Sequence, residues 1–278
     1  MSKKINSREE KLIAQCRQVL EKPSLAIRIA DKLGKPLEWL LNGVGEISPS
    51  VAKKIATVTR KALMSTLSMA IKTFPGTPAR GNVHAEVRGK VRHKLFVSAT
   101  GAAGGALGLA GLAVELPAST TIMMRSIADI ARQLGHDITR PNIQLECLQV
   151  FALGSSRSTA DDAAENTYFS TRIALARTLS EAAEYIAVRG LGAREAPVLV
   201  RFIAAVASRF EISVSEKAVA QALPAVGAVT AATINLVFLN HFQKMADAHF
   251  RILALEAKHG RAAVRRVYNR LGDEHRAR

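Results

Sequence analysis

The sequence is poor in cysteine and in aromatic residues. Only Cys16 and Cys147 occur among its 278 residues, and neither belongs to a CxxC motif. This argues against a disulfide framework and against a zinc site, and it predicts two buried thiols in a reducing cytoplasm. Aromatic residues make up 5% of the chain and hydrophobic residues 48%. That composition favours closely packed helices over strands.

Recognisable catalytic and targeting motifs are also missing. The sequence contains no GxxxxGK[ST] loop, no nucleophile elbow and no convincing Ser-His-Asp or Cys-His set. The opening stretch MSKKINSREEKLIAQ has basic residues but lacks the apolar segment of a signal peptide. We therefore expect a cytoplasmic protein without a metal or another cofactor. Enzymatic activity stays open, and the catalytic residues of any reaction are unknown.

Acidic residues are in the minority, and the basic excess is uneven. The formal net charge is +16, with 39 Lys and Arg against 23 Asp and Glu. Residues 1–94 hold 19 basic and 7 acidic residues, and residues 251–278 hold 8 and 3. Basic ends around a nearly neutral middle predict attraction to an anionic surface. A membrane surface is the expected partner, a membrane protein is a further one, and a merely solvated basic surface is the alternative.

Nucleic acid is the less favoured anionic partner. Two short basic segments within residues 24–63 resemble a helix-turn-helix only loosely, because the stretch between them is too long and too rich in glycine. We do not expect nucleic-acid binding. The oligomeric state cannot be predicted from these features.

Helical periodicity and helix-ending residues run through most of the chain. They predict an all-α protein, a multi-helix bundle with two long central helices rich in small residues at 95–116 and 218–240. The stretch PGTPARGN at 75–82 predicts a boundary between a basic helical region, 1–80, and a larger helical domain, 81–278. Helices are expected at 25–33, 51–74, 95–116, 119–134, 141–153, 163–188, 198–210, 215–223 and 225–258, with Gly135, Gly154 and Gly260 at helix ends.

The most unusual stretch is GAAGGALGLAGLAVELPAST at 101–120. On a helix its glycines share one face and permit close approach of a second helix; they are Gly101, Gly104, Gly105, Gly108 and Gly111. The uncharged run from 95 to 114 has the length of a membrane span, but its apolar content makes insertion marginal. Burial against a second helix is favoured, embedding in the membrane is the alternative, and a phosphate-binding loop is disfavoured.

Several polar residues are candidates for a functional site. Glu115 is the only charged residue between 95 and 124, so we expect a raised pKa or a partner such as Arg125 or another cation. Asp129 has ion-pair spacing to Arg125 and to Arg132. Glu165 and Tyr168 share a helix face with Arg172.

His241 and His249 complete the set of candidates. They lie on a stripe with Met245 and are followed by Glu256, so this face could present metal ligands. Two positions eight residues apart, however, lie about 12 Å apart along a helix. Packing histidines are therefore favoured over metal ligands.

Several blocks in order resemble the EcsC family. The resemblance runs from about residue 90 to residue 268 and rests on GGALGLAGLAVELPASTTIMMRSIADIARQLGHD, CLQVFALGS, the 168–177 helix, VSEKAVAQALPAVGAVTAATINLVFLNHF and MADAHFRILALEAKHG. It implies a predominantly helical bacterial protein from a family named after a gene beside an ABC transporter linked to secretion. It implies no catalytic residues.

Two functions follow as hypotheses. The first is a non-enzymatic accessory protein, associated peripherally or partly embedded at the cytoplasmic face of the membrane and linked to transport or secretion. The second is a soluble small-molecule-binding protein or enzyme, with a pocket between the glycine-rich helix and the long C-terminal helix polarised by Glu115, His241 or His249.

Overall fold

All regular structure in the described part of the chain is helical, which confirms the all-α prediction. The computed structural model describes residues 5–21, 25–33, 37–45, 47–73, 108–154, 167–190, 196–221 and 228–276. Its elements are α1 Ser7–Leu20, α2 Leu25–Leu33, α3 Leu37–Gly45, α4 Pro49–Thr73, α6 Gly108–Gln133, α7 Pro141–Gln149, the short 3-10 helix η1 Val150–Ala152, α8 Thr167–Arg189, α9 Pro197–Gln221, α10 Ala228–His259 and α11 Arg261–Arg276.

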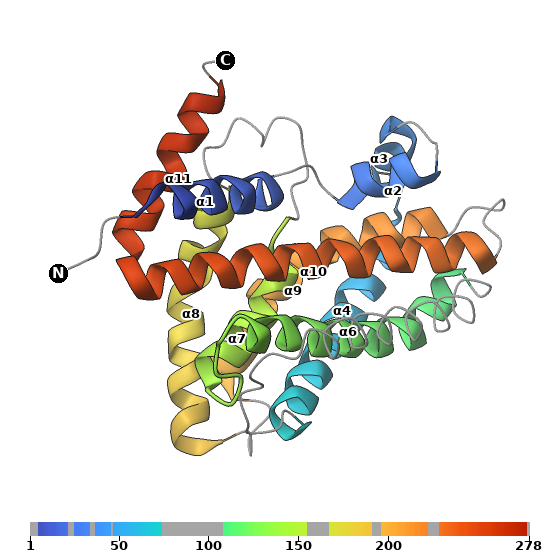
Figure 1. The fold of residues 1–278 in the computed structure, drawn as a ribbon. Coiled ribbons are helices and arrows are strands. Elements are labelled where there is room, and N and C mark those ends of the chain that lie inside the picture. The colour runs from blue at the N-terminus through green and yellow to red at the C-terminus, as the bar shows by residue number, and fades with distance from the viewer. Residues whose placement is uncertain are drawn as a thin grey trace.

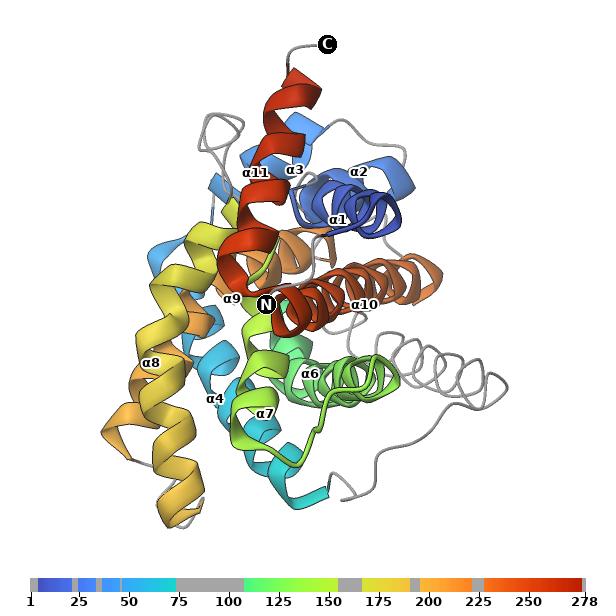
Figure 2. The same ribbon diagram turned by 60° about the vertical axis from the view of Figure 1, so that its left-hand side comes forward.

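The long helix α10 runs through the middle of the bundle (Figure 1). It packs against α1, α2, α6, α9 and α11. Figure 2 shows α1 and α2 on one side of α10 and α6 on the other. Helix α4 packs on α6 and α9, and α8 packs on α7 and α9. Helices from both ends of the chain therefore share one core with the middle.

The few aromatic residues are concentrated in that core. Phe151 of η1, Phe210 of α9, and Phe238 and Phe242 of α10 have ring centroids 4.9 to 5.9 Å apart. All four side chains are fully buried. Tilted and edge-on rings at these separations are the favoured aromatic geometry. The cluster fixes α9 and α10 against η1, directly after α7.

Pro117 does not end a helix, so the predicted break between 116 and 119 is wrong. Helix α6 continues through it. The proline cannot donate a backbone hydrogen bond to the carbonyl four residues earlier. Two hydroxyls nearby donate to other carbonyls of the helix. Ser119 Oγ donates to the oxygen of Leu116 at 3.2 Å, and Thr121 Oγ1 donates to the oxygen of Pro117 at 2.8 Å. Helix α6 packs against α4 and α10, and Thr66 Oγ1 of α4 lies 3.4 Å from Thr121 Oγ1, one turn after the proline.

Other predicted helix ends have mixed outcomes. The helices expected at 198–210 and 215–223 form the single helix α9, because the residues between them include neither glycine nor proline. Helix α11 follows Gly260 and was not predicted. Gly135, Gly154 and Gly260 have φ of 85°, 71° and 85°, so these predicted helix ends are confirmed.

Only part of the glycine-rich run lies among the described residues. Gly101, Gly104 and Gly105 lie outside the described residues, and so do the contacts of Gly108 and Gly111, which belong to the first turn of α6. None of the described helices combines the length and hydropathy needed to cross a bilayer. The boundary predicted near residue 80 stays a prediction, although α4 shares its core with α6 and α9.

Candidate functional site

Glu115 pairs with Lys217, and this answers the question of its partner. Lys217 Nζ of α9 donates to Glu115 Oε1 of α6 at 2.7 Å. The side chains are 0% and 2% exposed, respectively. Lys217 Nζ also lies 4.8 Å from the ring centroid of Phe238, a cation-π contact. Burial lowers the pKa of Lys217, while the Glu115 carboxylate acts against that shift.

Arg125 is therefore not the partner of Glu115. It is exposed on α6. Asp129 forms an ion pair with Arg132 at 3.3 Å. This is one of the two ion pairs that the sequence spacing allowed; the other was with Arg125. The Glu115–Lys217 pair lies among buried side chains, so it serves the packing of α6 on α9 and offers no surface for a substrate.

A second set of polar side chains, all buried except the partly buried Glu146, joins three helices, and we call it the buried polar network. Its members are Glu146 of α7, Tyr168 and Arg172 of α8, and His249 and Glu256 of α10. Tyr168 Oη lies 2.9 Å from His249 Nδ1, and His249 Nε2 lies 3.0 Å from Glu146 Oε2. Arg172 donates to both oxygens of Glu256, at 2.7 and 2.8 Å, and to Tyr168 Oη at 3.3 Å.

The proton positions in the network follow from these partners. Burial lowers the pKa of His249, so the ring is neutral at pH 7. Burial alone would raise the pKa of Glu146, but its hydrogen bond to His249 lowers the value overall. The carboxylate is therefore ionised and accepts the Nε2 proton, which leaves Nδ1 to accept the proton of Tyr168. Burial raises the pKa of this tyrosine.

Arg172 and Glu256 form a fork-to-fork ion pair. Burial alone would lower the pKa of Arg172, but the Glu256 carboxylate raises it overall. Two parallel hydrogen bonds between ionised groups are among the strongest polar contacts in proteins. The network resembles a proton relay in geometry, but Tyr168 is buried. Its members lock α7, α8 and α10 together, and the Tyr168–His249 pair inside it is not open to a substrate.

An open groove lies over this network, between α7, α8 and α11, and we call it the α7–α8–α11 groove. Its volume is about 370 Å³. Helix α8 supplies an apolar stripe to it, and α11 supplies two arginines, Arg261 and Arg265. Its lining residues are Asn142, Glu146, Gln149, Phe169, Arg172, Ile173, Ala176, Leu179, Ser180, Ala183, Arg261 and Arg265.

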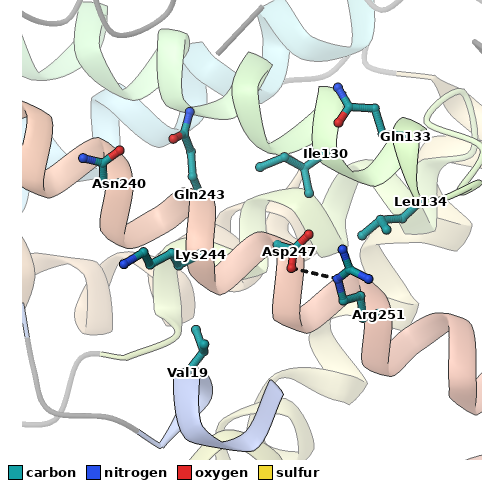
Figure 3. Close-up of a pocket in the computed structure, with 9 residues that line it drawn as sticks. All are labelled: Val19, Ile130, Gln133, Leu134, Asn240, Gln243, Lys244, Asp247 and Arg251. Carbon is teal, nitrogen blue, oxygen red and sulfur yellow. Dashed lines mark hydrogen bonds and ion pairs between the residues drawn. The ribbon is translucent and has the colours of Figure 1, made fainter. Parts of the chain in front are cut away.

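A second pocket, of about 480 Å³, lies between α6 and α10 (Figure 3). The sequence predicted a pocket between these helices, but Glu115, His241 and His249 do not line it. Asp247 and Arg251, both on α10, form a 2.8 Å ion pair at one side of the pocket. Its lining residues are Val19, Ile130, Gln133, Leu134, Asn240, Gln243, Lys244, Asp247 and Arg251. The lining is mixed: Val19, Ile130 and Leu134 are apolar, but they do not form a stripe along one helix like that of α8.

His241 and His249 have separate surroundings. His241 is buried, and neither ring nitrogen has a hydrogen-bond partner among the described residues. Burial lowers its pKa to about 3. The described residues contain no cluster of His, Cys, Asp and Glu that could hold a metal ion. Cys16 and Cys147 are free and buried, as expected, and burial raises the pKa of Cys16 to about 12.

The structure thus unites some of the candidates and separates others. Tyr168 and His249 meet in the buried polar network, whereas Glu115 and His241 lie elsewhere, and Glu165 is outside the described residues. The sequence analysis missed Glu146, Lys217, Arg261 and Arg265. Lys217 could have been singled out as a buried charge, because it lies beside an apolar run on a predicted helix. Arg261 and Arg265 have i,i+4 spacing, but α11 itself was not predicted.

Comparison with known proteins places the chain in a family. Searches of curated proteins and of solved structures gave no match. The EcsC protein family matches residues 49–254. The match begins at α4, well before residue 90, where the blocks that resemble the family begin. Since it covers most of the sequence, the chain belongs to the EcsC family.

Proposed function

We propose that this protein is a non-enzymatic accessory protein that docks on an anionic membrane surface through the exposed face of α4. The observation that carries the proposal is the charge of this helix. Its 25 residues include five Lys and Arg and no acidic residue. The proposal places the protein at the cytoplasmic face of the membrane, where a transport or secretion protein is a further partner.

Helix α4 is divided into an apolar side and a basic side. Ile55, Ala62, Leu63 and Leu67 are buried against the bundle. Four cations are exposed on the other side: Lys53, Lys54, Arg60 and Lys61. None of the four forms an ion pair with another described residue. Their charges are therefore available to an external anion.

The size of the expected effect follows from the number of charges. A Lys or Arg near an anionic lipid surface contributes about 1 kcal/mol, so four contribute about 4 kcal/mol. That corresponds to roughly 1,000-fold in partitioning and weakens with salt. A flat lipid surface is favoured over nucleic acid because the basic side belongs to one helix packed along the bundle and includes no aromatic residue to stack on bases.

Vesicle flotation tests the proposal. Full-length protein is mixed with neutral phosphatidylcholine vesicles or with vesicles containing phosphatidylglycerol, at low and at physiological salt. The test variant carries K53Q, K54Q, R60Q and K61Q. We expect the unmodified protein to float with anionic vesicles only, and the variant to lose at least tenfold in bound fraction.

A matched control separates a specific surface from bulk charge. Arg125, Arg140, Arg189 and Arg266 are exposed on four separate parts of the fold, and their replacement by Gln removes the same net charge. The proposal requires much weaker losses in this control. Equal losses in both variants, no preference for anionic vesicles, or binding to duplex DNA in place of vesicles would each overturn it.

Small-molecule binding is the second candidate function. The observation that favours it is the α7–α8–α11 groove, which combines arginines with an apolar stripe. The pocket of Figure 3 is larger, but its apolar residues come from separate helices, and Asp247 and Arg251 of its lining pair with each other on α10. Direct titration of the full-length protein with monomeric amphiphiles tests this candidate.

A further inference from the structure

We infer that the α7–α8–α11 groove binds an amphipathic anion, with a carboxylate or phosphate head on Arg261 and Arg265 and an apolar chain along α8. The inference rests on the second candidate function and gives it a ligand class. The groove volume, about 370 Å³, is within the range of roughly 300 to 1,000 Å³ typical of small-molecule sites.

The head-group contacts are supplied by two arginines one helical turn apart on α11. Arg261 is 68% exposed, and its Nε lies 3.9 Å from Glu256 Oε2, too far for a hydrogen bond. The Arg265 guanidinium lies 5.8 Å from the ring centroid of Phe169. Both therefore have donors to offer. Two planar guanidinium groups on one side of a groove can each donate paired hydrogen bonds to the oxygens of a carboxylate or phosphate.

Arg172 supplies charge but not a binding fork. Its guanidinium already donates to both oxygens of Glu256 and to Tyr168. Among the described residues that line the groove, Glu146 is the only one with a carboxylate, and its Oε2 accepts from His249 and from Gln149. Because Glu146 lies on α7, it repels an anion from that wall. The head group is thereby directed to α11.

The apolar chain has a continuous path along α8. Phe169, Ile173, Ala176, Leu179 and Ala183 recur at helical spacing and line the groove. From the first to the last they span about 21 Å of helix, which is longer than an extended dodecyl chain. Ile173, a member of this stripe, is 57% exposed. Burying it under a ligand chain is favourable because apolar surface leaves water.

The groove is also rigid at its base. The buried polar network fixes Arg172 and Glu146, and through them α7 and α8, by hydrogen bonds of 2.7 to 3.3 Å. A preformed site loses less entropy when a ligand binds. The network therefore fixes the apolar stripe of α8 against the α7 wall of the groove before any ligand arrives.

Isothermal titration calorimetry of the full-length protein tests the inference. The probes are dodecyl phosphate and dodecanoate, both below their micelle-forming concentrations, and inorganic phosphate. We expect one dodecyl ligand per chain, with affinity at least tenfold lower in the R261Q/R265Q variant. The R189Q/R266Q variant removes the same charge from exposed positions outside the groove and should bind as the unmodified protein does.

A second variant, Ala176→Trp, fills the chain path while leaving both arginines in place. Ala176 is exposed, so the fold should be kept, as circular dichroism can check. Loss of dodecyl binding in this variant supports the inference. Inorganic phosphate binding as tightly as dodecyl phosphate, equal binding by the two arginine variants, or no dodecyl binding at all would overturn it.

Vesicle flotation keeps this result separate from membrane docking. The R261Q/R265Q variant should still float with anionic vesicles, and the α4 variant should still bind dodecyl phosphate in solution. If the α4 variant lost dodecyl phosphate binding together with flotation, the ligand would be held at α4 and the groove assignment would be wrong.

Discussion

Removing the ammonium of Lys217 should strongly destabilise the protein. The change Lys217→Met leaves the Glu115 carboxylate, 2% exposed, without the partner that now lies 2.7 Å away. Breaking a buried ion pair from one side costs about 3 to 5 kcal/mol. Since 1 kcal/mol corresponds to roughly 2 to 4 °C in Tm for a chain of this size, we expect Tm to fall by roughly 6 to 20 °C.

The double variant tests the reasoning more sharply than either single one. Glu115→Leu alone strands the ammonium and should cost a similar amount, whereas Glu115→Leu with Lys217→Met leaves no buried charge. Apolar replacement of a whole buried pair is often neutral or stabilising, so the double variant should unfold within about 1 kcal/mol of the unmodified protein.

Urea unfolding followed by far-UV circular dichroism measures all four corners of this cycle. The exposed pair Arg177–Glu181 serves as the control, because surface ion pairs contribute only about 0 to 1 kcal/mol. A double variant whose cost equals the sum of the two single costs would refute the reasoning, since it would mean that the two charges do not compensate each other.

Two further predictions concern buried positions. The pKa of His241 is about 3 when folded and 6.5 in the unfolded chain, so only the unfolded state takes up this proton between those values. The free energy of unfolding should be unaffected above about pH 6.5 and fall below that pH, by about 2 kcal/mol at pH 5. Urea unfolding of the His241→Leu variant should lack this loss. Parallel pH profiles for the variant and the unmodified protein would contradict the prediction. A Cβ at Gly154, with φ of +71°, would lie 2.6 Å from Met245 Cε, whereas one at Gly135 would meet nothing within 4 Å. Gly154→Ala should therefore lose about 1 to 3 kcal/mol more than Gly135→Ala, and equal shifts in Tm would show that the predicted clash is relieved at no cost.

The fold class and several helix ends could be predicted because they depend on local signals. Gly135, Gly154 and Gly260 adopt the left-handed conformation that such helix ends require. Pro117 was misread because the same residue type ends some helices and is tolerated in others. The difference lies in contacts made by α4 and α10 with α6, which a reading of local sequence cannot contain.

The candidate site was predictable one residue at a time but not as a whole. Tyr168 and His249 could be singled out by type and helical position, but they are 81 residues apart in sequence. Lys217 and Glu115 are 102 apart. Which side chains meet depends on how α6, α8, α9 and α10 pack, and packing is decided by the shapes of whole helix faces. The exposed arginines of α11 could not be found from hydrophobic periodicity, because that pattern reports only the apolar residues of a helix.

The contacts of α1 with the end of the chain impose an order on folding during synthesis. Glu9 bonds to Lys258, 249 residues later, and Glu21 bonds to Tyr268, 247 residues later. At 5 to 20 residues per second, the ribosome needs roughly 12 to 50 s to supply these partners. Throughout that interval the apolar side of α1, with Ile13, Cys16 and Leu20, has no α10 or α11 to cover it. The apolar side of α1 therefore stays without its native cover until translation has supplied residue 268.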